Sequence, residues 1–146
     1  MHRTQTAPRI LSVLAALLLL ITSLTACSGG VTREEAKTAM DSLLVALDNE
    51  NYAEAAALYH PDAAMTEELL AALAEQVKTK VGIDLTEGAT VEKITGISSS
   101  YYDSTVGGSR YELTAKIQAG DKTASLTVEV IRNDEGYGIF KVECYP

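Results

Sequence analysis

The chain has 146 residues, with 12 Lys and Arg against 20 Asp and Glu, and a formal net charge of -8. This length accommodates one domain, and a hydrophobic content of 47% excludes a disordered protein. Two cysteines are too few for a disulfide scaffold, and the acidic balance argues against nucleic-acid binding, which requires a basic face.

The first 26 residues have the organisation of a secretory signal peptide. A polar segment that contains Arg3 and Arg9 but no acidic residue precedes the almost wholly apolar run 10–24. As a helix this run would span roughly 22 Å, less than the roughly 30 Å of hydrocarbon that a membrane-spanning helix must cross. We therefore expect a cleaved leader and not a permanent span.

The end of this leader, Leu24-Thr25-Ala26-Cys27, resembles the lipobox of bacterial lipoproteins. The resemblance implies that residues 1–26 are removed and that Cys27 becomes the first residue and carries a diacylglyceryl thioether. Two acyl chains hold a protein stably on a bilayer, whereas one holds it only marginally. We therefore expect residues 27–31 to be a lipidated cysteine with a short tether. The protein would then lie on the extracytoplasmic face of a bacterial membrane.

Capping residues and apolar spacing predict three helices in the next part of the chain, beginning after Thr32, Asn51 and Thr66. Glu35 follows Thr32 by three residues, which is the spacing of a capping box. The second helix should end at His60-Pro61, because the residue before a proline avoids the helical region.

After the third helix the apolar period changes from 3.6 to 2. The segment 91–102 is rich in β-branched and aromatic residues, and a clean alternation of apolar and polar residues begins at Arg110. Tight turns at 120–121 and 133–136 predict an antiparallel meander. The expected fold class is α+β, with N-terminal helices packed on one curved antiparallel four-stranded sheet over residues 32–146.

This order of elements resembles the NTF2-like (cystatin-like) fold. Residues 47–55 resemble the start of the family's second helix, residues 58–63 its end, and Gly136-Tyr137-Gly138-Ile139 its final strand. The chain is more narrowly similar to small bacterial lipoproteins that carry NTF2-like domains of unknown function. The resemblance implies a concave sheet that can form a pocket with the helices. Some members are ketosteroid isomerases or dehydratases with a carboxylate or histidine in this pocket. Others bind small molecules or proteins, or dimerise through the sheet.

His60 and Asp62 are the candidate acid/base pair, since a histidine beside a carboxylate can move protons. Their spacing around Pro61 is also typical of a polar turn, and we favour that interpretation. Enzymes of the isomerase branch carry a further aspartate shortly after this point, where this chain has Ala64-Met65-Thr66.

The candidate pocket residues are aromatic apart from one histidine: Tyr52, Tyr59, His60, Tyr111 and Tyr137. No zinc set is available, because one histidine and Cys144 remain once Cys27 is lipidated, and no cofactor is implied. Cys144 is expected to be a small buried hydrophobe, with a reactive thiol as the alternative. Tyr101-Tyr102 is a candidate edge for contact with another chain.

The leading hypothesis is a lipid-anchored binding or interaction domain without catalytic activity, whose partner is a small molecule or an envelope protein. One alternative is a small pocket enzyme of the isomerase or dehydratase type that uses His60 and Asp62. Another is a structural subunit of an envelope complex. A homodimer is a further alternative. The predicted outer face of the sheet is polar, which argues against a large obligate interface. Its residues are Arg110, Glu112, Thr114, Lys116 and Gln118.

Overall fold

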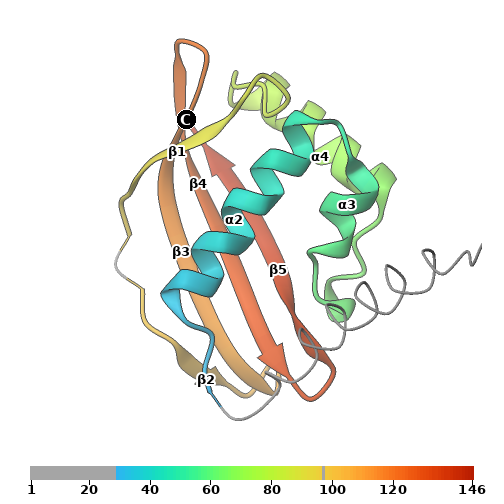
Figure 1. The fold of residues 1–146 in the computed structure, drawn as a ribbon, viewed down its shortest axis with the longest axis vertical. Helices are drawn as coiled ribbons and strands as arrows, with labels where there is room; N and C mark the ends of the chain where they lie inside the picture. The colour runs from blue at the N-terminus through green and yellow to red at the C-terminus, as the bar shows by residue number, and fades with distance from the viewer. Residues whose placement is uncertain (1–28, 97) are drawn as a thin grey trace, which may run out of the picture.

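The computed structural model describes residues 29–146 except residue 97 (Figure 1). The expected signal peptide, residues 1–26, and Cys27 therefore lie outside the described residues. In chain order the elements are α2 (Arg33–Asp48), α3 (Tyr52–Ala57), the 3₁₀ helix η1 (Pro61–Ala63), α4 (Glu67–Lys80), β1 (Thr90–Ile94), β2 (Tyr101–Asp103), β3 (Gly108–Ala119), β4 (Lys122–Asn133) and β5 (Gly136–Tyr145). The class is α+β, as the sequence predicts.

The predicted helix caps are present. The Thr32 hydroxyl accepts a hydrogen bond from the Glu35 amide at 3.2 Å, and the Glu35 carboxylate accepts one from the Thr32 amide at 2.9 Å. Asn51 and Thr66 cap α3 and α4 in the same way through their side-chain oxygens. These bonds satisfy amides that a helix start leaves without partners, so they fix where each helix begins.

The sheet is open and antiparallel, in the order β1-β3-β4-β5, with β2 also paired to β3. The alternation on β3 is confirmed, since Tyr111, Leu113, Ala115, Ile117 and Ala119 are all buried. They join one hydrophobic cluster with apolar residues of α2. Figure 1 shows α2 crossing β3 and β4 on this face, while α3 and α4 lie together on the β5 side. The helices thus cover one face of the sheet.

The sheet has five strands, where four were expected. Segment 91–102 forms two short strands instead of one, because the register of β1 shifts between Val91 and Lys93 and the chain leaves β3 after Gly96. The Gly96 amide donates to the Thr114 carbonyl at 3.1 Å, and pairing resumes at Tyr101, opposite Arg110.

The segment before η1 extends the opposite edge of the sheet. The His60 amide donates to the Ile139 carbonyl at 2.8 Å, and the Ile139 amide donates to the Leu58 carbonyl at 2.9 Å. Gly138 permits this approach, because a Cβ atom there would lie 2.5 Å from the His60 nitrogen and 2.7 Å from the Tyr59 carbonyl carbon. Both contacts are to backbone, so a larger residue could not be accommodated by moving a side chain.

The two ends of the sheet differ. At one end residues 29–31 meet the start of β3, the end of β4 and the start of β5, and we call this the tether end. The other end carries the turn at 120–121 and the C-terminus (Figure 1). In the described part of the chain, no helix is long and apolar enough to cross a membrane.

Candidate functional site: a groove at the tether end

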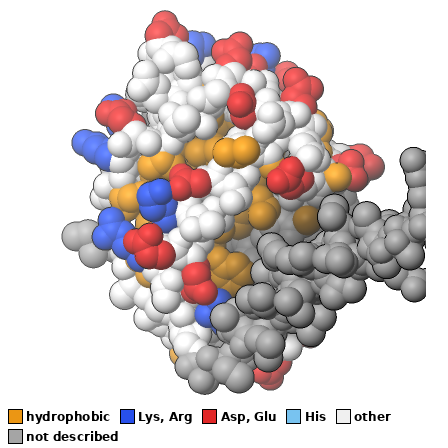
Figure 2. Space-filling view, in the orientation of Figure 1, with side chains coloured by type: hydrophobic (Ala, Val, Ile, Leu, Met, Phe, Trp, Pro, Cys, Tyr) orange, Lys and Arg blue, Asp and Glu red, His pale blue; other side chains and the backbone are white. Residues whose placement is uncertain are grey.

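An open groove of about 1330 Å³ lies at the tether end, between the start of α2, strand β2 and the β4–β5 turn. Its lining combines aromatic rings with an ion pair: Tyr101, Tyr102, Tyr111, Tyr137, Glu35 and Arg132. Pockets that bind small molecules typically combine apolar surface with a few placed polar groups. Figure 2 shows acidic and basic side chains interspersed over the helix-covered face, with hydrophobic side chains visible between them.

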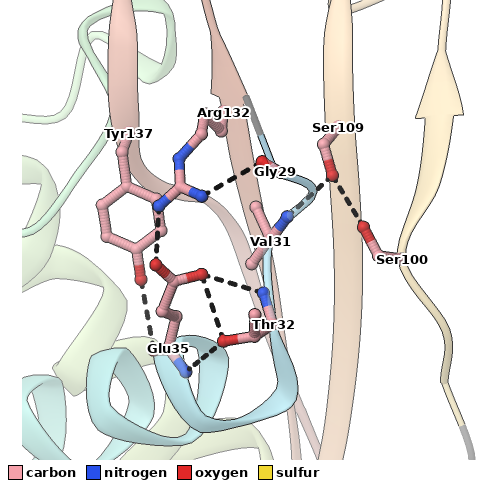
Figure 3. A network of polar contacts seen from close by, with 8 residues as sticks. All are labelled: Gly29, Val31, Thr32, Glu35, Ser100, Ser109, Arg132 and Tyr137. Atoms are coloured by element: carbon pink, nitrogen blue, oxygen red, sulfur yellow. Dashed lines mark hydrogen bonds and ion pairs between the residues drawn. The ribbon is translucent and has the colours of Figure 1, made fainter. Parts of the chain in front are cut away.

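Arg132 organises the polar side of this groove (Figure 3). Its guanidinium lies 2.7 Å from a Glu35 carboxylate oxygen and donates to the Gly29 carbonyl at 3.2 Å. It also stacks 4.9 Å from the centroid of the Tyr137 ring, a cation–π contact. The Tyr137 hydroxyl donates to the Glu35 backbone carbonyl at 3.1 Å, so the start of α2 is held to β4 and β5. Burial, followed by the nearby Glu35 carboxylate, raises the pKa of Tyr137, which keeps this hydroxyl protonated.

Further contacts fix the tether to the sheet (Figure 3). The Val31 amide donates to the Ser109 hydroxyl at 2.9 Å, and the Ser109 and Ser100 hydroxyls are 2.7 Å apart. The Val31 side chain is only 1% exposed. Gly30 lies against the Ser100 side chain, with no room for a Cβ atom unless Ser100 moves. Residues 29–31 are therefore part of the folded domain and not a free linker.

Glu35 uses both of its carboxylate oxygens, one toward Arg132 and the other toward the Thr32 amide. Partial burial by itself would raise the pKa of Glu35. The hydrogen bond and charge of Arg132 and the hydrogen bonds from Thr32 have the larger combined effect, so this pKa lies below its usual value. A carboxyl group with a lowered folded-state pKa stabilises the fold above its unfolded-state pKa. That stability is lost as the pH falls through the folded-state value.

We expect the Glu35→Gln protein to be less stable than the wild type at pH 7 by about 0.5–1 kcal/mol, because the ion pair is partly exposed. Glutamine can still form the capping box, so the loss of stability measures the contribution of the negative charge on the Glu35 carboxylate. Urea unfolding at pH 7 and at pH 3 measures it, and the difference between the two proteins should shrink at pH 3. An equal difference at both pH values would contradict this assignment.

His60 lies outside the groove and is buried at the start of an exposed turn. Its ring accepts a hydrogen bond from the Asp62 amide at Nδ1, at 3.1 Å, and its Nε2 lies 2.9 Å from the Asn133 Oδ1. The Asn133 amide nitrogen donates to Asp62 and to the Val106 carbonyl, so Oδ1 faces the ring and accepts from Nε2–H. With both ring nitrogens bonded and the residue 1% exposed, His60 caps η1 and has no nitrogen free for a ligand.

The predicted pocket residues are not all brought together. Tyr111 and Tyr137 line the groove. Tyr59 is buried in the core, where burial raises its pKa, and its hydroxyl has no hydrogen-bond partner among the described residues. Tyr52 begins α3 and is half-buried against the core. Asp62 lies on the polar turn beside Glu135, and a hydrogen bond between the two carboxyl groups raises the pKa of Glu135.

Cys144 lies in β5 and packs against the core. Burial raises the pKa of its thiol to about 11, which disfavours the reactive thiolate at neutral pH. Among residues 29–96 and 98–146, no three His, Cys, Asp or Glu side chains are grouped to hold a metal ion.

Sequence reasoning missed Arg132 and Glu35 as site residues. The available signal was the period of β4, which places Arg132 on the same face as Leu126, Val128 and Val130. A cation at the end of an apolar strand face needs a partner, and Glu35 supplies it.

Comparisons of the chain with protein-family models, curated proteins and solved structures gave no match.

Proposed function

We propose that this protein is a bacterial lipoprotein whose NTF2-like domain is held on the extracytoplasmic face of the membrane by Cys27 and binds a small molecule or envelope protein. The observation that carries the proposal is the position of the groove. It lies at the end of the sheet where residues 29–31, which follow the lipobox, join the fold. The anchor and the binding surface would then be neighbours.

A binding role agrees with the chemistry of the groove better than a catalytic one. The exposed rings of Tyr101 and Tyr137 offer apolar surface, and Arg132 with Glu35 offers fixed polar contacts. His60, the one histidine among residues 27–146, is occupied in its own turn and does not line the groove. The acid/base pair proposed for the enzyme alternative therefore has no open path to a ligand in this groove.

Native mass spectrometry of the full-length protein, extracted from a bacterial host in mild detergent, tests the binding role. We expect a non-covalent mass on the wild type that denaturation removes. The Arg132→Gln protein should lose this mass, because the groove loses the cation that orders Glu35 and Tyr137. The Lys116→Gln protein is the control, since it loses one positive charge on the opposite face of the sheet. A bare mass for the wild type, or equal retention in Arg132→Gln, would contradict binding in the groove.

A further inference from the structure

The tether contacts fix which end of the domain faces the bilayer, provided that Cys27 is the lipid anchor proposed above. The Gly29 carbonyl is bonded to Arg132, and only Ser28 separates Gly29 from Cys27. Two residues of extended chain reach at most about 7 Å. The acyl chains would therefore start within a short distance of the tether end, and the domain has little freedom to turn its other end toward the membrane.

Two exposed aromatic side chains lie beside the point where the tether joins the fold. Tyr101 is 50% exposed and Tyr102 is 74% exposed. Tyr102 is paired with Ser109, the residue whose hydroxyl holds the Val31 amide. Ser100, next to Tyr101 in the chain, contacts both Ser109 and Gly30. The aromatic pair and the lipid attachment thus share one end of the molecule.

We propose that Tyr101 and Tyr102 contact the headgroup region of the bilayer to which Cys27 is anchored. Tyrosine suits this position, because its ring enters the apolar boundary while its hydroxyl remains hydrated. The short tether keeps these side chains near the membrane without a separate binding step. The groove, which both tyrosines line, then opens next to the lipid surface.

The acidic residues at the tether end influence which lipid headgroups the domain can approach. Asp134 and Glu135 lie in the β4–β5 turn and also line this groove. Anionic headgroups would repel these carboxylates. The contact therefore rests on the aromatic rings and the anchor, and it should be at least as strong on zwitterionic phosphatidylcholine as on a mixture that contains anionic lipid.

Tryptophan fluorescence tests this contact, because the chain contains no Trp. The variants are Tyr102→Trp at the tether end and Tyr145→Trp at the other end, where the native tyrosine is 50% exposed. Each full-length lipidated protein is placed in phosphatidylcholine vesicles with or without phosphatidylcholine brominated near the top of its acyl chains. The Tyr102→Trp protein should show blue-shifted emission that the brominated lipid quenches. The Tyr145→Trp protein should show neither effect, and its emission should be quenched by aqueous iodide.

Each other outcome overturns the proposal. Unshifted emission from Tyr102→Trp that iodide quenches would place the aromatic pair in water. Blue-shifted emission that brominated lipid leaves unchanged would show that a protein chain or a second copy covers the pair. Equal lipid quenching of both variants would exclude a fixed orientation. Flotation of the vesicles separates these results from failure of the anchor, since a protein without the lipid would not float with them at all.

Discussion

Replacing His60 with alanine should lower the free energy of unfolding by about 3 kcal/mol. The residue is 1% exposed, and its ring is bonded to Asn133 on one side and to the Asp62 amide on the other. Alanine would leave a cavity beside β5 and would remove the acceptor of the Asp62 amide, while the Asn133 Oδ1 would keep its hydrogen bond from the Glu135 amide. The cavity therefore accounts for most of the expected loss, and the broken hydrogen bonds add to it.

Urea unfolding followed by circular dichroism measures this loss, with Asp62→Ala as the control. Asp62 has a side chain that is 38% exposed and accepts a hydrogen bond from the Asn133 amide at 3.2 Å. Its replacement should change stability by less than about 1 kcal/mol. If His60→Ala were as stable as the wild type but lost the bound ligand, the structural role would be wrong, and the acid/base interpretation would gain support.

The helices were predictable because their signals are local. Thr32 and Glu35 are three residues apart, and the bonds of a capping box depend on that spacing alone. The alternation along β3 is equally local, since successive side chains of any strand point to opposite faces. The inward position of Tyr111 followed from this alternation, whereas a pocket position for Tyr137 was expected from the resemblance of residues 136–139 to a final strand, and both residues line the groove.

The division of segment 91–102 into β1 and β2 was not predictable in this way. Both strands pair with β3, and the break between them depends on a register shift after Val91 and on where the chain rejoins β3 at Tyr101. Strand propensity favours a single extended segment over these residues and carries no information on how each position meets its partner.

The polar side of the groove depends on contacts between distant parts of the chain. Arg132 and Glu35 are 97 positions apart in the sequence, and Gly29 is 103 positions from Arg132. No periodic pattern connects residues at such separations. Whether the His60 ring is free to act as an acid or base depends on the same kind of information, because Asn133, which binds this ring, lies 73 positions away in the sequence. The local turn around Pro61, by contrast, was predicted and is present.

Removal of the Cys27 thiol should have the largest effect on the protein's location. Without a thiol no diacylglyceryl thioether can form, and under the proposed function the two acyl chains of that thioether hold this acidic domain on the bilayer. We expect the Cys27→Ser protein to lose essentially all membrane retention or to accumulate as an uncleaved precursor. Cys144→Ser is the matched control, since it makes the same substitution at the only other cysteine, within β5.

The most direct measurement is the distribution of the two variants and the wild type between membrane and soluble fractions of a bacterial host, with the mass of the N-terminal peptide determined for each. The wild type and Cys144→Ser should be in the membrane fraction, with a peptide that begins at Cys27 and carries a diacylglyceryl group. The Cys27→Ser protein should lack both the modification and the processed, membrane-bound form. A Cys27→Ser protein that is still cleaved and still bound to the membrane would contradict the lipid anchor and the orientation inferred from it.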